Sequence, residues 1–147
     1  MAIVSCFAGQ VFAHCQVPCG IYDDQMRFER MLEDQKTIGK GIAQIREMAS
    51  KKDAQSVNQT VRWINTKEEH ASNTQKIISE YFMTQRLKSD GENYTKKLTA
   101  AHAVMVAAMK CKQSTDPTTA EALEKAIFDF YQAYTGKKPH FHDHDHD

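Results

Sequence analysis

Apolar residues recur at three- and four-residue steps through most of this chain, and no segment shows sustained alternation of apolar and polar residues. Such spacing places the apolar side chains on one side of an α-helix. Four segments carry this pattern. We predict helices over about 24–50 and 53–82, a third after the break at 89–91, and a fourth from Pro117 to the residue before Gly136.

Capping residues support these boundaries. Asp23 or Asp24 can cap the first helix, Asp116 followed by Pro117 is typical of a helix start, and Gly136 is typical of a helix end. Four amphipathic helices with short connections predict an all-α fold, an antiparallel four-helix bundle over residues 23–136. In chain order, the residues expected in its core are Phe28, Met31, Leu32, Ile38, Ile42, Ile45, Val57, Val61, Ile64, Ala71, Ile78, Phe82, Tyr94, Leu98, Ala101, Met105, Ala108, Ala120, Leu123, Ile127, Phe130, Tyr131 and Tyr134.

The composition limits the classes of function. A length of 147 residues is typical of one domain with a single core. Acidic and basic residues balance at 19 each, which argues against nucleic acid or an anionic membrane as the main partner. No apolar run approaches the length of a membrane span.

The segment His14–Tyr22 carries the most distinctive chemistry, because it places two thiols and an imidazole just before the first predicted helix. Cleavage after Ala13 would add a free α-amine to this set. The amine, the Cys15 amide nitrogen and the sulfurs of Cys15 and Cys19 could then form a plane of two nitrogens and two sulfurs. Such a plane suits Ni(II) or Cu(II), with the His14 imidazole as an axial ligand, better than it suits tetrahedral zinc.

This segment resembles the nickel hook of nickel superoxide dismutases, whose pattern runs His-Cys-x-x-Pro-Cys-Gly-x-Tyr from a processed N-terminus. The matching residues are His14, Cys15, Pro18, Cys19, Gly20 and Tyr22. Gln16 departs from the Asp found in family members, and the helical body with its Tyr81-Phe82 pair matches in outline. The resemblance implies a superoxide dismutase that converts superoxide to dioxygen and hydrogen peroxide. It also implies one nickel per subunit, cycling between Ni(II) and Ni(III), and an N-terminal metal-binding hook attached to the bundle.

Each hook residue has an expected role. His14, Cys15 and Cys19 are the expected metal ligands, since two thiolates and a deprotonated amide stabilise Ni(III). Tyr22 is expected near the open face of the metal, where it could order water or gate the anion, or else it packs at the helix start. By resemblance, Glu29 is a candidate support for the axial His14 imidazole.

Residues 1–13 are interpreted as a pro-peptide that a maturation protease removes to free the His14 amine. They lack Lys and Arg and are short for a signal peptide, although Val11-Phe12-Ala13 is similar to a secretory cleavage site. The alternative is an ordinary flexible terminus. A cytoplasmic location is expected, with an exported or organellar one left open. The resemblance also implies a homohexamer in which neighbouring subunits partly enclose the hooks.

Polar residues dominate part of the second predicted helix, from Asn65 to Lys76. This face, which includes Glu68 and Gln75, is either open to solvent or buried against another subunit or the active site. Lys67 and His70 lie in the same stretch and could hold or steer charge near the hook.

The remaining metal-binding side chains lie apart from one another. The tail, residues 137–147, alternates His and Asp and is either a local metal reservoir or a solvated end. Cys6 lies in the leader, Cys111 is expected to be a small buried hydrophobe, and His102 is expected to be packed or at the surface rather than a ligand.

Other classes of function remain to be weighed against the dismutase. A nickel-binding or metal-delivery protein would use the hook and the tail without turnover. A ferritin-type metal enzyme is disfavoured, because neither His70 nor His102 has a Glu three residues before it. The sequence also lacks the Cys-x-x-Cys-His pattern of haem attachment and the redox Cys-x-x-Cys pair.

Overall fold

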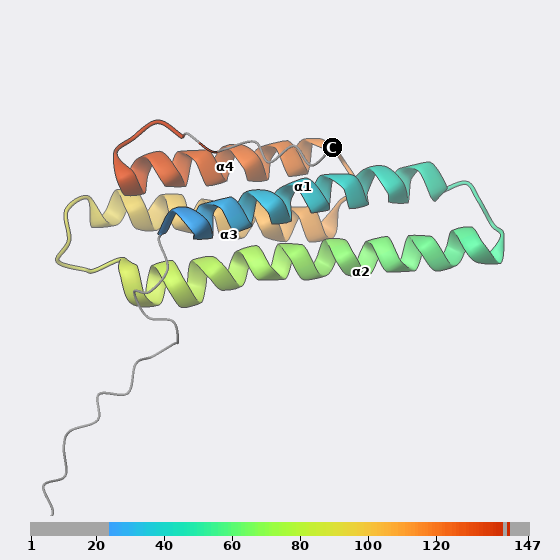
Figure 1. The fold of residues 1–147 in the computed structure, drawn as a ribbon, viewed down its shortest axis with the longest axis horizontal. Coiled ribbons are helices and arrows are strands. Elements are labelled where there is room, and N and C mark those ends of the chain that lie inside the picture. The colour runs from blue at the N-terminus through green and yellow to red at the C-terminus, as the bar shows by residue number, and fades with distance from the viewer. Residues whose placement is uncertain (1–23, 140, 142–147) are drawn as a thin grey trace, which may run out of the picture.

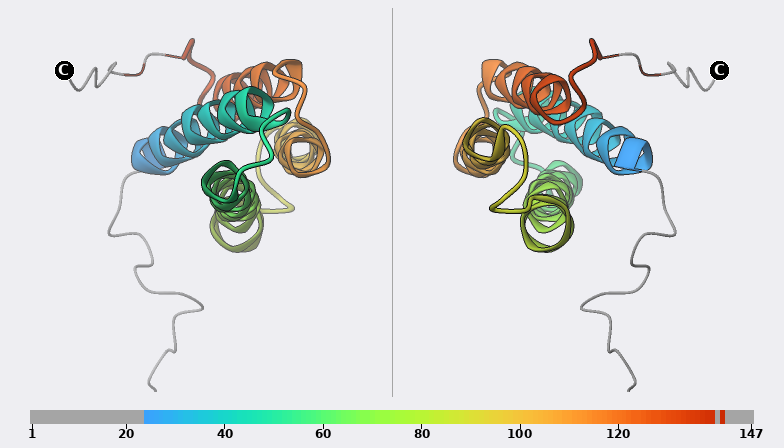
Figure 2. Two further views of the ribbon diagram at one scale, coloured as in Figure 1. Left: turned by 90° about the vertical axis from the view of Figure 1, so that its right-hand side faces the viewer. Right: turned by 90° about the vertical axis from the view of Figure 1, so that its left-hand side faces the viewer.

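The computed structural model describes residues 24–139 and 141. Its elements are α1 (Asp24–Met48), α2 (Ala54–Lys76), the π-helix η1 (Ile77–Arg86), α3 (Tyr94–Gln113) and α4 (Thr118–Thr135). The four α-helices run up, down, up and down, with η1 continuing α2 (Figure 1). Each α-helix packs against its neighbours in sequence, and α1 also packs against α4, so that the bundle closes (Figure 2). The predicted all-α four-helix bundle is confirmed for this part of the chain.

The predicted caps lie close to the observed helix ends. Asp53, which was predicted only as the approximate start of the second helix, caps α2: its carboxylate accepts hydrogen bonds from the Ser56 amide at 2.9 Å and from the Ser56 hydroxyl at 2.7 Å. Asp116 accepts from the Thr118 amide at 3.0 Å, at the start of α4. Gly136 ends α4 with a φ of 73°, a left-handed conformation that glycine adopts without a steric penalty.

The second helix differs from its prediction at its C-terminal end. The α-helical part stops at Lys76, and a wider π-helix continues to Arg86, four residues beyond the predicted end at Phe82. Its backbone hydrogen bonds join residues five apart. For example, the Leu87 amide donates to the Phe82 carbonyl at 2.8 Å. Long π-helical stretches are rare and are often found at functional sites.

Most of the predicted core is confirmed. All six residues predicted on α1 are buried, as are Ala71, Ile78 and Phe82 on the second helix. On α3 and α4 the predicted residues are either buried or packed against the core. Phe28 is the centre of an aromatic cluster near the start of α1. The centroid of its ring lies 4.9–6.0 Å from those of Phe82, Phe130, Tyr131 and Tyr134.

The prediction is wrong for Val57, Val61 and Ile64, which are 50%, 51% and 40% exposed. These residues lie in the first half of α2, where α1 and α2 extend beyond the ends of α3 and α4 (Figure 1). Within the described chain α1 is thus the main partner of this part of α2, and the side that carries the three residues has no cover. Sequence periodicity identified an apolar side of the helix but not whether a partner covers it.

None of the helices that the structure describes is both long enough and apolar enough to cross a lipid bilayer.

Candidate functional site

The predicted hook ligands His14, Cys15 and Cys19, and Tyr22 beside them, lie outside the described residues, as does the leader 1–13. The attachment point of the hook is described, because α1 begins at Asp24. Consecutive Cα atoms are about 3.8 Å apart, so the Cα of Tyr22 lies within about 8 Å of that of Asp24. The side chains around Asp24 therefore lie close to the point where the predicted hook joins the bundle.

Asp24 accepts hydrogen bonds from side chains of two distant segments. The Tyr81 hydroxyl donates to Oδ1 of Asp24 at 2.6 Å. Its Oδ2 accepts from the Tyr134 hydroxyl at 2.7 Å and from Nη2 of Arg86 at 2.8 Å. We call these four residues the Asp24 cluster. It ties the first residue of α1 to η1 and to the last turn of α4.

The π-helix explains why Tyr81 and Arg86 both reach Asp24. In an α-helix, residues five apart point about 140° away from one another. Hydrogen bonds that span five residues widen the turn and reduce this angle, so that such residues point to the same side of the helix. Side chains in η1 follow the same spacing, since the Thr84 hydroxyl donates to the Ser79 carbonyl at 2.7 Å. The local change of helix type thus places a phenol and a guanidinium on one carboxylate.

Proton affinities in the cluster reflect these contacts. Burial by itself would raise the pKa of the Asp24 carboxyl, but hydrogen bonds from Arg86, Tyr81 and Tyr134 outweigh it and hold that pKa below its usual range. Burial, together with the hydrogen bond to Asp24, raises the pKa of Tyr81 to about 12 and the pKa of Tyr134 to about 12. At neutral pH the cluster therefore combines one carboxylate, two neutral phenols and one guanidinium.

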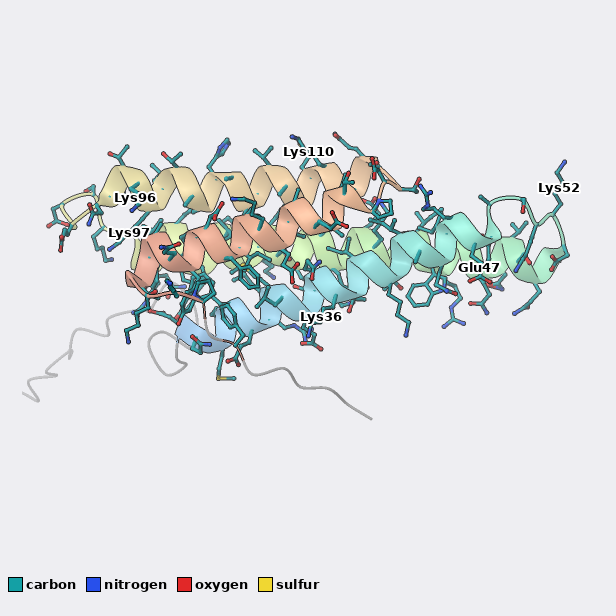
Figure 3. All side chains as sticks on the ribbon, turned by 90° about the horizontal axis from the view of Figure 1, so that it is seen from above. Lys36, Glu47, Lys52, Lys96, Lys97 and Lys110 are labelled. Atoms are coloured by element: carbon teal, nitrogen blue, oxygen red, sulfur yellow. The ribbon has the colours of Figure 1, made fainter. Side chains whose placement is uncertain are left out.

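Additional cations flank the cluster. The Arg27 guanidinium lies 4.7 Å from the centre of the Tyr81 ring, and Nζ of Lys97 lies 5.8 Å from the centre of the Tyr134 ring. Lys97 lies at the end of the bundle where α1 begins, whereas Glu47 and Lys52 lie at the opposite end (Figure 3). Arg86 forms the ion pair of this cluster, with its Nη2 2.8 Å from Oδ2 of Asp24.

Comparison with known families identifies this chain. A family model described as nickel-containing superoxide dismutase matches residues 9–138. The chain belongs to the nickel-containing superoxide dismutase family. The match spans residues 14–22 and the whole bundle, and it confirms the predicted family. No curated protein and no solved structure matches the chain.

Membership in the nickel-containing superoxide dismutase family makes this protein an oxidoreductase that acts on superoxide with a nickel cofactor. Residues 24–139 and 141 contain no group of three or more His, Cys, Asp or Glu side chains able to hold a metal ion. Cys111 is buried and its thiol donates to the Thr119 carbonyl at 3.3 Å. Burial raises the pKa of this thiol, which disfavours the thiolate that a metal requires. Among the described residues, Cys111 is therefore a poor donor for nickel.

The polar stretch of α2 contacts other helices of the same chain, which neither predicted alternative anticipated. Lys67 is buried and its Nζ donates to the carbonyls of Cys111 at 2.7 Å and Lys112 at 2.6 Å, at the end of α3. His70 pairs with the buried Asp34, and Gln75 donates to a carbonyl of α3 at 3.1 Å. Lys67 precedes Tyr81 by 14 residues, roughly 20 Å along the helix, so it lies away from the hook attachment.

The other sequence-predicted side chains have ordinary surroundings. Glu29 accepts a hydrogen bond from Gln25 at 3.1 Å, one turn earlier on α1, and its predicted contact with His14 lies outside the described residues. His102 is exposed on α3, which agrees with one of its two predicted positions, the protein surface. Cys111 is a buried residue, as predicted.

Sequence reasoning did not find the Asp24 cluster. Asp24 was predicted only as a possible helix cap and Tyr134 only as a core residue, whereas Arg86 was not singled out. The one local signal is the five-residue spacing of Tyr81 and Arg86, which marks a shared face only in a π-helix. The partners of Asp24 are 57, 62 and 110 residues away in sequence, too far for any motif to connect them.

Proposed function

We propose that this nickel superoxide dismutase holds one nickel per subunit at His14, Cys15 and Cys19, after a protease has removed residues 1–13. The family match includes all of these ligands, and the two thiols next to a potential terminal amine are the donors in the chain that suit nickel best. Bound nickel supplies a one-electron couple, so that one superoxide is oxidised to dioxygen and a second, with two protons, is reduced to hydrogen peroxide.

The residues of the hook have separate tasks in this proposal. The Cys15 and Cys19 thiolates and the Cys15 amide nitrogen donate the charge that brings the nickel couple into range, and the amine and imidazole of His14 complete the donor set. Pro18 removes a backbone donor and stiffens the turn before Cys19. Tyr22 lies next to the start of α1 in sequence, where its hydroxyl can order water beside the open face.

Two cationic side chains near the attachment point of the hook support the same activity. Superoxide is an anion, and Arg27 and Lys97 flank the cluster at the attachment point of the hook. Positive charge around a site raises the local concentration of an anionic substrate and speeds its arrival, an effect that added salt weakens.

Subunit assembly and cell compartment are further parts of the proposal. A homohexamer is supported by the exposed apolar side chains of Val57, Val61 and Ile64, which a neighbouring subunit can cover. A cytoplasmic location is supported by the need to keep Cys15 and Cys19 reduced.

Comparison of two forms of the protein tests the proposed site. A chain that begins at His14 is expected to bind nickel and remove superoxide, and the full chain with residues 1–13 is expected to do neither well. Cys15→Ser should abolish both properties. Cys111→Ser is the matched control, because Cys111 is buried on α3, and it should keep them. Equal nickel binding and activity with and without residues 1–13 would contradict the role of the His14 amine. A protein that binds nickel without turnover would instead be a metal-delivery protein.

A further inference from the structure

The nickel hook needs a fixed base, because three proposed ligands come from one short segment at a processed chain end. Metal and catalytic groups work only when they are held within about 0.5 Å of the required geometry. Covalent attachment to α1 limits how far the hook can lie from the bundle. The first turn of that helix sets the direction in which the chain leaves the bundle. Whatever fixes the first turn of α1 therefore also fixes the base of the hook.

The first residue of α1 has more partners than a helix end needs. Both carboxylate oxygens of Asp24 are engaged, by Tyr81 and Arg86 of η1 and by Tyr134 of α4. The side chain of Asp24 is 20% exposed and that of Arg86 is 38% exposed, so the cluster is partly shielded from water. Partial burial strengthens such charge-assisted hydrogen bonds relative to the same bonds at an open surface.

The helix that supplies two of these donors departs from α-helical geometry at this site. A π-helix is rare and is frequently found at functional sites. Here it aligns Tyr81 with Arg86 opposite Asp24. The Tyr81 ring is further held between the guanidinium groups of Arg27 at 4.7 Å and Arg86 at 5.8 Å. The position of the phenol is thus fixed from several sides.

We propose that Asp24 is a positioning residue for the nickel hook, which locks the first turn of α1, and with it the base of residues 14–22, onto η1 and α4. This inference rests on the proposed nickel site. Asp24 acts through the hook residues and does not itself contact nickel or superoxide. Loss of the lock lets the base of the hook pivot, so that its ligands spend less time in the geometry that nickel requires.

Two variants weaken the lock in different ways. Asp24→Asn keeps the shape of the side chain but removes its charge and one acceptor oxygen. Tyr134→Phe removes one donor from α4 and leaves the start of α1 unchanged. Asp53→Asn is the matched control, because it makes the same substitution at the N-terminus of α2, at the opposite end of the bundle.

Two measurements test the proposal. Hydrogen exchange of the segment 22–28 in the metal-free full chain is expected to speed up several-fold in Asp24→Asn and Tyr134→Phe, and to stay unchanged in Asp53→Asn. Nickel affinity of the chain that begins at His14 is expected to fall about tenfold in both Asp24→Asn and Tyr134→Phe, as for other residues that orient metal ligands. The absorption spectrum of bound nickel should broaden in the same two variants.

The outcomes separate the lock from a purely structural role. Faster exchange with unchanged nickel affinity and spectrum would show that Asp24 only stabilises the bundle, and would overturn the proposal. Unchanged exchange in both variants would overturn it as well. If Asp24→Asn does not fold, Tyr134→Phe decides the question. Failure of the unaltered chain to bind nickel would defeat the proposed site itself, whereas normal binding by the variants would defeat only the inference.

Discussion

Asp34 of α1 and His70 of α2 form a buried pair, with Nδ1 of His70 2.6 Å from Oδ1 of Asp34. Asp34 is fully buried, and its other oxygen accepts from the Thr74 hydroxyl at 3.5 Å. An ionised carboxylate can only accept, so Nδ1 is the donor when Asp34 is charged. The pair therefore joins two helices through a polar contact inside an otherwise apolar bundle.

Truncation of Asp34 should be costly, whereas a neutral replacement of the same shape should not be. Asp34→Ala leaves the His70 ring nitrogen without its partner and opens a cavity, so it should lower the free energy of unfolding by about 2–3 kcal/mol. Asp34→Asn keeps a hydrogen-bonding group and avoids the burial of a charge, so its effect should stay within about 1 kcal/mol at neutral pH. Urea unfolding followed by circular dichroism measures both values.

Glu33→Ala is the matched control, because Glu33 is 63% exposed and paired only with Arg30 on the same helix. It should change stability by less than about 0.5 kcal/mol. A similar cost for Glu33→Ala and Asp34→Ala would contradict the buried pair.

The pH dependence of the free energy of unfolding should also differ between the unaltered protein and Asp34→Asn. Burial raises the pKa of Asp34 above 3.8, more than the hydrogen bond from His70 lowers it. The folded state then binds the proton more tightly, so the contribution of Asp34 to stability falls as pH rises above 3.8, and Asp34→Asn removes that contribution.

The Asp24 cluster predicts a loss of stability at alkaline pH. Its two phenols have folded-state pKa values of about 12, against 10.0 for an unperturbed tyrosine. Because the folded-state pKa is raised, the folded protein keeps these protons longer than the unfolded chain does. Their contribution is fully present below pH 10 and is lost as pH rises towards about 12. Urea midpoints across this range should therefore decline steeply.

Tyr134→Phe should make that alkaline decline shallower, since it removes one of the two shifted phenols. Tyr94→Phe is the control, because the Tyr94 hydroxyl is not among the donors to Asp24. Ultraviolet difference absorption of the folded protein should show the matching late ionisation. Identical declines in the unaltered protein and in Tyr134→Phe would contradict the shared hydrogen bonds to Asp24.

The fold was largely predictable because its determinants are local. Helix periodicity and the caps at Asp116 and Gly136 depend on neighbouring residues, and the structure confirms them. The π-helix was not predictable from the same pattern, because the four-residue spacing of Ile78 and Phe82 fits an α-helix equally well. Its wider turns coincide with contacts to α1 and α4, which lie far away in sequence.

The candidate site also has a part that the sequence predicts and a part that it does not. The proposed nickel ligands fall within one short motif, so spacing alone revealed them. The residues that anchor the base of the hook come from three separate elements, and their shared contact with Asp24 emerges only when the bundle closes. Buried polar residues such as Lys67 show the same limit. The sequence marked an unusual polar stretch on α2, but its partners are backbone carbonyls, which have no sequence signature.

Lys67 should contribute strongly to stability through these carbonyls. Its ammonium group satisfies two acceptors at the C-terminus of α3, where the helix dipole also favours a positive charge. Lys67→Met removes these bonds and leaves buried acceptors, so it should lower the free energy of unfolding by about 2–3 kcal/mol. Lys76→Met, on the same helix at a position 69% exposed, should cost less than about 0.5 kcal/mol. Equal costs in urea unfolding would show that the Lys67 contacts are unimportant.

The exposed apolar side of α2 predicts a charge-sensitive subunit contact. Val57, Val61 and Ile64 point to one side of the helix and are 40–51% exposed. Val61→Asp places a charge in the middle of this patch, and burial of an unpaired carboxylate against a neighbour would be strongly unfavourable. We expect this variant to sediment as a smaller species than the unaltered protein at equal concentration, with unchanged helical content.

Gln55→Glu is the matched control for this last experiment. It also adds one negative charge to the exposed start of α2, but on the side of the helix opposite Ile64 and about 120° around the helix from Val61. Sedimentation velocity at several protein concentrations should show the assembly of Gln55→Glu unchanged. If Val61→Asp assembles like the unaltered protein, the apolar side of α2 is not a subunit interface, and a homohexamer must form through other surfaces. If both variants dissociate, added negative charge rather than lost apolar contact is the cause.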